Sequence, residues 1–255
     1  MPGSNPYDLG LEQSPVNYRP LTPLGFIART AQVYPQRLAV IHGARRYNWS
    51  ETYDRVCRLS SALKAAGIGR GDTVVLIAAN TPEMIEAHFG VPMCGAVLCT
   101  VNTRLDPAAI AYILMHCEAR LVISDTEYAS TIGQALALLE HRPRVIDIDD
   151  TEGPGGERLG ELDYEAFIGA ASTDEHWQEP VDEWQPIALN YTSGTTGRPK
   201  GVVYHHRGAY LAALSNMLDW QMPRHSIFLW TLPMFHCNGW GFVWTMAVNA
   251  GTHVC

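Results

Sequence analysis

Apolar residues along positions 46–150 recur in two alternating patterns, one helical and one strand-like. Val56, Leu59 and Leu63 fall on one face of a helix that begins near residue 51. Ser50 stands at a favourable N-cap position for this helix, and Gly67 suits its C-terminal cap. Short apolar runs that follow are typical of buried strands. The predicted strands are residues 73–78, 97–101, 121–124 and 144–148.

Helices are predicted between these strands. Thr81-Pro82 and Asp106-Pro107 each combine an N-capping side chain with a proline at the first helical position. The predicted helices cover about residues 82–90, 107–117 and 127–140. Buried strands that alternate with helices pair in parallel and carry helices on both faces of the sheet. The pattern therefore predicts an α/β fold with doubly wound, mainly parallel sheets and flanking helices.

A second series of elements is expected after two polar stretches, residues 147–158 and 172–182, which have the composition of surface loops. The series comprises strands 187–191, 202–204 and 227–231, a helix over about 207–218, a loop at 235–240 and another helix. We expect a leader over residues 1–20 and one large domain over 21–255, with α/β segments at about 46–150 and 185–255. Residues 251–255 resemble the start of a further strand, so the chain is expected to end within this domain.

Composition excludes several classes of protein. With 255 residues, of which 47% are hydrophobic, the chain can bury a sizeable core, and its net charge of −8 argues against a nucleic-acid partner. The six cysteines form no C-x-x-C pair and no zinc-finger spacing. The chain also has no signal-peptide pattern and no apolar run of about 18 residues. We therefore expect a cytoplasmic protein without a membrane span.

The sequence YTSGTTGRPKGV at residues 191–202 combines hydroxyls, glycines and a lysine between two apolar runs. Glycine lets the backbone approach an anion closely, so that consecutive N–H groups converge on phosphate oxygens. The common nucleotide loop needs its lysine directly after a glycine, whereas Arg198 and Pro199 precede Lys200 here. A phosphate-binding loop of another kind is predicted, and the alternative is a flexible surface linker.

Taken whole, this run resembles the phosphate-loop signature of the adenylate-forming superfamily, which includes acyl-CoA synthetases, luciferases and the adenylation domains of peptide synthetases. A second block, LPMFHCNGW at residues 232–240, resembles the acyl-pocket motif of the same superfamily and lies downstream in the expected order. The resemblance extends from Leu21 to Cys255. It implies the N-terminal part of the large domain of an adenylating enzyme, closest to the acyl-CoA synthetases, without the small C-terminal domain.

The resemblance also implies roles for individual residues. The residues expected to bind the ATP phosphates are Thr192, Ser193, Gly194, Thr195, Thr196, Gly197 and Lys200. Those expected to be catalytic are Thr195, Lys200 and His236, with Thr195 nearest the Mg²⁺ ion. Those expected to line the acyl pocket are His236, Asn238, Gly239 and Trp240. A bulky Trp240 suggests a short or medium acyl chain. Asn102 resembles a further family position, although it reads equally well as a turn residue.

The implied function is ATP-dependent activation of a fatty or other carboxylic acid to an acyl-adenylate, followed by thioester formation with coenzyme A. Two alternatives remain open. An amino-acid-activating domain would carry an acidic residue close after His236, and residues 235–240 contain none. A catalytically inactive nucleotide-binding fragment is the other alternative, since the family's small domain supplies a catalytic lysine. A homodimer is a candidate assembly.

Overall fold

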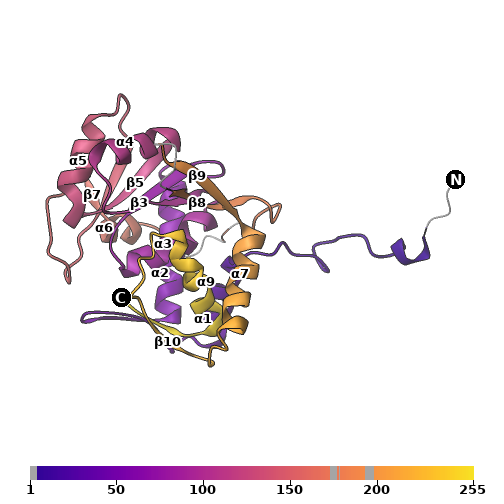
Figure 1. Ribbon diagram of the computed structural model, residues 1–255. Helices are drawn as coiled ribbons and strands as arrows, with labels where there is room; N and C mark the ends of the chain where they lie inside the picture. Colours follow the sequence, from indigo (N-terminus) through magenta and orange to yellow (C-terminus); the bar gives the residue numbers. More distant parts are fainter. Residues whose placement is uncertain (1–4, 173–176, 178, 193–197) are drawn as a thin grey trace.

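The described residues form two β-sheets, which are drawn in Figure 1. The computed structural model describes residues 5–172, 177, 179–192 and 198–255. The larger sheet contains β3 (Thr73–Ile77), β4 (Val97–Thr100), β5 (Ala119–Asp125), β6 (Arg144–Ile148), β7 (Leu162–Asp163), β8 (Pro186–Thr192) and β9 (Lys200–His205). The smaller sheet contains β1 (Leu38–His42), β2 (Arg45–Asn48), β10 (Ile227–Leu229) and β11 (Thr252–Val254). Their strand orders are β7-β6-β5-β3-β4-β8-β9 and β10-β11-β1-β2.

Most pairs among the described strands are parallel, as predicted, and two are antiparallel. β8 pairs with β9 in antiparallel register, and β1 pairs with β2 in the same way. Strand β8 joins the sheet of the first α/β segment beside β4. Strand β11 instead pairs with β1 from the beginning of the chain, and β10 pairs with the other edge of β11. The two sequence segments therefore interlock across two sheets.

Helices cover both faces of the larger sheet (Figure 1). The helices are α1 (Leu24–Val33), α2 (Trp49–Ala65), α3 (Pro82–Met93), α4 (Pro107–His116), α5 (Ala129–Ala137), α6 (Tyr164–Gly169), α7 (His206–Asp219), α8 (Cys237–Trp240) and α9 (Phe242–Asn249). Short 3₁₀ turns occupy Pro6–Asp8 and Thr126–Tyr128. Val74 and Leu76 of β3 pack with the α2 and α3 core, whereas Val75 and Ile77 face the α4 and α5 core. This alternation confirms the doubly wound arrangement.

The helix caps confirm two predictions and correct one. Thr81 caps α3, and the Asp106 Oδ1 atom accepts from the Ala109 amide at 2.9 Å at the start of α4. The predicted cap at Ser50 is wrong, because α2 begins at Trp49 with Asn48 as its cap. Asn48 and Glu51 form a reciprocal capping box with two hydrogen bonds of 2.8 Å. That box satisfies two free backbone donors, which a cap at Ser50 would leave unpaired.

Other element boundaries also differ from the predictions. The helix expected over 127–140 is shorter, and begins with the 3₁₀ turn before α5. The strand expected over 202–204 is the longer β9, which includes Lys200. Within residues 251–255, Thr252–Val254 form the strand β11. None of the helices that the structure describes is long and apolar enough to cross a membrane.

Candidate active site

The carboxyl ends of β4 and β8 border a cavity of about 490 Å³. We call it the central cavity. The chain places β4 on one side of β3 and β5 on the other, so the connecting helices α3 and α4 cover opposite faces. In open α/β sheets such a reversal of strand order leaves a crevice beyond the carboxyl ends of the strands, where ligands bind. The central cavity is lined by Thr100, Val101, Asn102, Leu105, Ala109, Ile113, Asn190, Tyr191, Thr192, Pro199, Val202, Tyr204, Phe235, His236 and Cys237.

Both ends of the predicted phosphate loop meet at this cavity. Thr192, the last residue of β8, pairs directly with Lys200, the first residue of β9, so the loop is the connection of a β-hairpin. Thr192 and Pro199 line the central cavity, whereas Lys200 is exposed and is not among its lining residues. The predicted site residues Ser193, Gly194, Thr195, Thr196 and Gly197 lie outside the described residues, so their roles stay predictions.

The predicted acyl-pocket motif divides between two cavities. His236 is exposed, lines the central cavity and places its Nε2 atom 3.8 Å from Cys237 Sγ. Trp240 is 66% exposed and lines a neighbouring apolar cavity of about 490 Å³. Tyr204 and Cys237 line both cavities. Trp240 therefore does not close the central cavity, and it bounds the space beyond Tyr204 and Cys237.

Asn238 and Gly239 are buried, which does not fit the pocket-wall role expected for them. The Asn238 side chain is fully buried and lies between Asn190 and His88. A Cβ atom at Gly239 would lie 2.5 Å from the Trp230 ring, and the Gly239 backbone has φ +57°. Glycine is needed here for packing against Trp230 rather than for approach of a substrate. Neither residue lines the central cavity or its neighbour.

Three residues near the cavity were missed by the sequence analysis. Tyr204 lies in β9 between the two cavities, and Asn190 and Thr100 are buried polar side chains at the ends of β8 and β4. A signal for Asn190 was present, because an amide interrupts an apolar strand directly before the glycine-rich loop. His205 and His206 have structural contacts: His205 caps α7, and buried His206 binds the Thr22 hydroxyl at 2.8 Å.

Comparison with known proteins identifies the family. The sequence profile of the family described as AMP-binding enzyme matches residues 27–255. The chain belongs to this family. Acetate/butyrate–CoA ligase AAE7, peroxisomal, of Arabidopsis thaliana is 50% identical over 257 residues, which cover 96% of this chain and 45% of that protein. Trans-cinnamate:CoA ligase, peroxisomal, of Petunia hybrida is 45% identical and covers 94% of this chain and 45% of that protein.

This member of the AMP-binding enzyme family spans about half the length of the curated relatives it matches. Solved structures show the same fold. The N-terminal domain of FACL13 from Mycobacterium tuberculosis, solved with an inhibitor, has a TM-score of 0.80 and 25% identity, and the match covers 92% of this chain and 57% of that one. The anthranilate CoA ligase AuaEII in complex with anthranoyl-AMP has a TM-score of 0.83, with 92% and 45% covered. At 23% identity, AuaEII supports the fold alone.

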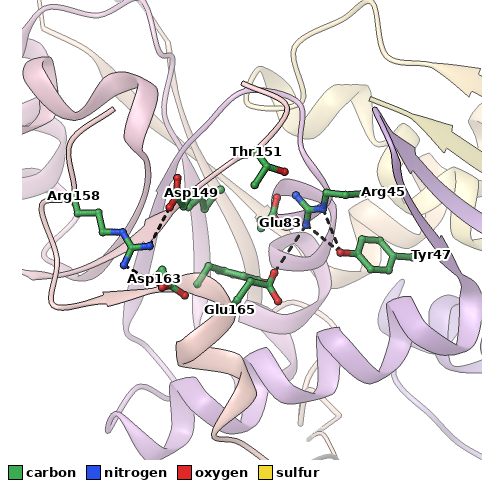
Figure 2. Close-up of a pocket in the computed structure, with 10 residues that line it drawn as sticks. Arg45, Tyr47, Glu83, Asp149, Thr151, Arg158, Asp163 and Glu165 are labelled. Atoms are coloured by element: carbon green, nitrogen blue, oxygen red, sulfur yellow. Dashed lines mark hydrogen bonds and ion pairs between the residues drawn. The ribbon is translucent and has the colours of Figure 1, made fainter. Parts of the chain in front are cut away.

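A separate, polar cavity lies between β2, β6 and α6 (Figure 2). Its volume is about 370 Å³, and charged side chains line it. These charges pair with one another: Arg45 with Glu83, and Arg158 with Asp149 at 3.0 Å and Asp163 at 3.1 Å. Neighbouring carboxylates neutralise both arginines, and none of the predicted motifs reaches this cavity. We therefore assign its charged residues a structural role rather than a role in ligand binding.

Proposed function

We propose that this chain forms part of an AMP-forming acid–thiol ligase. In the first half-reaction, a carboxylate oxygen attacks the α-phosphorus of ATP, the acyl-AMP bond forms and pyrophosphate leaves. In the second, the thiol of coenzyme A attacks the acyl carbon and AMP leaves. The observation that carries the proposal is the central cavity beyond the carboxyl ends of β4 and β8, because the ends of the predicted phosphate loop and residues of the predicted acyl motif both line it.

The loop between Thr192 and Lys200 is proposed to bind the phosphates of ATP. Its hydroxyls and backbone N–H groups are donors, and preorganised donors stabilise charge that develops in a transition state. Lys200 is proposed to supply positive charge, and His236 to lie beside the reacting carboxylate. The hydroxyl oxygens of Thr192 and Thr195 are candidate metal ligands, because Mg²⁺ prefers oxygen ligands. Among the described residues, no cluster of three or more His, Cys, Asp or Glu side chains could hold a metal ion on its own. Mg²⁺ would neutralise phosphate charge when bound.

The proposed substrate is a short aliphatic or small aromatic monocarboxylic acid. Apolar side chains, including Val101, Ile113 and Phe235, line the central cavity, whose volume of about 490 Å³ suits a small acid beside a nucleotide. None of the described residues that line the cavity is acidic, which disfavours an amino-acid substrate because its ammonium group would lack a countercharge. The relatives named for acetate or butyrate, trans-cinnamate and benzoate support the same size range.

Nucleotide binding without turnover is a second candidate for the 255-residue chain by itself. The match covers only 45% of the CoA ligase AAE7, so catalytic residues in the rest of such a ligase have no counterpart in the matched region.

We also propose a reducing compartment such as the cytoplasm, because all six cysteines are free thiols. Several relatives are named peroxisomal. Microscopy of a fluorescent fusion that leaves the chain's own C-terminus free would separate cytoplasm from peroxisome.

Two measurements on the purified chain test the proposal. Calorimetry with butyryl sulfamoyl adenosine, a stable mimic of butyryl-AMP, measures binding at the site, and butyrate-dependent pyrophosphate release measures adenylation. Butyryl-CoA formation by the chain alone is not expected. Binding without pyrophosphate release would favour the second candidate. If the mimic does not bind to the folded chain and pyrophosphate is not released, the proposed function is wrong.

A further inference from the structure

A continuous row of buried polar side chains links the two predicted motifs behind the central cavity. Asn238 Nδ2 donates to His88 Nε2 at 3.1 Å, and Asn190 Nδ2 donates to Asn238 Oδ1 at 2.7 Å. The Thr100 hydroxyl lies 3.3 Å from Asn190 Oδ1 and donates to the Phe235 carbonyl at 2.8 Å. All four side chains are buried. We call His88, Asn238, Asn190 and Thr100 the neutral relay.

The relay has one direction, which His88 sets. Its Nδ1 atom lies 2.7 Å from the Met84 carbonyl oxygen, which can only accept, so Nδ1 carries the proton. Nε2 of the neutral ring is then an acceptor and requires the NH₂ group of Asn238 to face it. The Asn238 oxygen must therefore face the NH₂ group of Asn190. Burial lowers the pKa of His88 to about 4, which keeps the ring neutral at physiological pH.

The relay passes through a turn with an unfavourable backbone, to which Asn238 belongs. Cys237, Asn238 and Trp240 have φ values of 49°, 52° and 56°, and Gly239 between them has φ 57°. This left-handed conformation costs free energy for residues with a Cβ atom, and such strain persists only where surrounding contacts hold it. The two side-chain hydrogen bonds of Asn238 supply such contacts, together with a bond of 2.8 Å from Asn216 to the Trp240 carbonyl.

We propose that His88 is a positioning residue for adenylation. Through Asn238 it holds the left-handed turn that presents His236 and Cys237 to the central cavity. Through Asn238 and Asn190 it also holds the end of β8, where Thr192 begins the phosphate loop. The acyl motif and the phosphate loop thereby keep a fixed relative position. The effect on ligand binding rests on the proposed function, whereas the geometry of the relay does not.

Two substitutions at His88 separate the hydrogen bond from the buried volume. His88→Leu removes the acceptor for Asn238, and His88→Gln retains an amide oxygen that can accept. His206→Leu is the matched control, because His206 is another buried histidine with one side-chain partner, Thr22, and it does not line the central cavity. We expect His88→Leu to weaken binding of butyryl sulfamoyl adenosine about tenfold or more, and the other two variants to stay within about threefold of the unmodified chain.

Equal affinity of folded His88→Leu and the unmodified chain would overturn the proposal. Equal losses for His88→Leu and His88→Gln would also overturn it, because volume rather than the acceptor would then matter. Nuclear magnetic resonance gives a readout that needs no variant: at pH 7 His88 should be the neutral tautomer protonated on Nδ1. A proton on Nε2 would contradict the direction of the relay.

The same method separates failure of the proposal from failure of the proposed function. If even the unmodified chain does not bind the mimic, the function is wrong and the relay is judged by amide signals alone. His88→Leu should then shift the signals of Cys237, Trp240 and Thr192, and His206→Leu should leave them in place. If neither variant shifts these three signals, the positioning role is excluded.

Discussion

Two polar networks lie close together in this protein: one is neutral and buried, whereas the other is charged and includes the exposed Glu165. The neutral relay joins α3, β4, β8 and the 237–240 turn through amide, hydroxyl and imidazole groups. The second network, which we call the ionic cluster, consists of Arg45, Arg55, Glu83, Glu86 and Glu165. It joins β2, α2, α3 and α6, and part of it lines the polar cavity in Figure 2. One helix, α3, contributes to both.

The two networks differ in how strictly they determine the orientation of the groups that they join. Hydrogen bonds between neutral groups have required directions, so the relay defines how the two motifs are oriented. Ion pairs tolerate more geometries, and their gain is offset by the cost of removing charges from water. Arg55 Nε lies 2.6 Å from Glu86 Oε1, and its Nη2 atom lies 2.6 Å from Glu165 Oε1. We therefore expect the ionic cluster to control stability and the relay to control the site.

The largest expected effect is on stability, from Arg55→Met. The substitution leaves Glu86, which is fully buried, without its countercharge, and breaking such a pair costs about 3–5 kcal/mol. Burial already raises the pKa of Glu86 to about 7. Without Arg55 the group folds best when protonated, so the loss should be greater at pH 8 than at pH 5.5. Urea unfolding measures both values.

Arg29→Met on the exposed surface of α1 is the control for this experiment. It should change the free energy of unfolding by less than about 0.5 kcal/mol. Affinity for the adenylate mimic should stay unchanged in folded Arg55→Met. Loss of affinity in Arg55→Met under conditions where the variant is fully folded would show that the ionic cluster, and not only the relay, shapes the site.

The next largest effect is a loss of unfolding free energy at acidic pH, which comes from His88 of the neutral relay. The unfolded His88 ring has a pKa near 6.5 and binds a proton that the folded ring, with a pKa of about 4, does not bind. Stability from this residue is therefore present above pH 6.5 and is lost as the pH falls toward 4, by roughly 3 kcal/mol in all. His206 and His253, with pKa values lowered to about 4 and 3 by burial, act in the same direction.

Comparison of the unmodified chain with His88→Gln isolates the contribution of His88. Urea unfolding at pH 7 and pH 4.5 should show a smaller loss in the variant, since one titrating group has been removed. An identical loss in both proteins would mean that the folded His88 ring takes up a second proton between pH 7 and pH 4.5, as the unfolded ring does. Nε2 would then not be held as the acceptor of Asn238, and the direction of the relay would be wrong.

A third prediction concerns chemistry rather than stability. Thr195→Ala should lower butyrate-dependent pyrophosphate release about 100-fold, if a preorganised donor to phosphate is removed, with little change in unfolding free energy. Lys200→Met should act in the same direction and more weakly. In a chain that does not turn over, weaker binding of ATP is the corresponding readout. Unchanged adenylation by folded Thr195→Ala would remove this residue from the site.

Local patterns in the sequence predicted much of the fold. The apolar runs of β3, β4, β5 and β6 and the caps at Thr81 and Asp106 depend on neighbours within a few residues, and all were predicted. Pairing of β8 with β4, and of β11 with β1, joins residues far apart in the chain. The periodicity of a strand contains no information on such partners, so the division into two interlocked sheets was not foreseen.

The candidate site likewise has features that the sequence predicted and features that it did not. Motif order identified Thr192 and His236, which both line the central cavity. The burial of Asn238 and the close packing of Gly239 on Trp230 were not foreseen, because they follow from a left-handed turn that reverses the expected directions of the side chains. Asn tolerates this conformation better than most residues, and that preference is a weak signal in a single sequence.

The smallest expected effect comes from Trp240→Gly. Trp240 bounds the apolar cavity beyond Tyr204 and Cys237, so its removal should shift acid preference toward longer chains, with about 0.8 kcal/mol gained for each methylene that becomes buried. Stability should change little, because the indole is 66% exposed and glycine relieves the left-handed backbone at φ 56°. Trp220→Gly is the control, as Trp220 is 68% exposed and lines neither this cavity nor the central one. Affinities for acyl sulfamoyl adenosines from acetyl to octanoyl measure the shift. If the chain-length profile of Trp240→Gly matches that of the control, the acyl chain does not extend past Cys237, and the central cavity alone holds the acid.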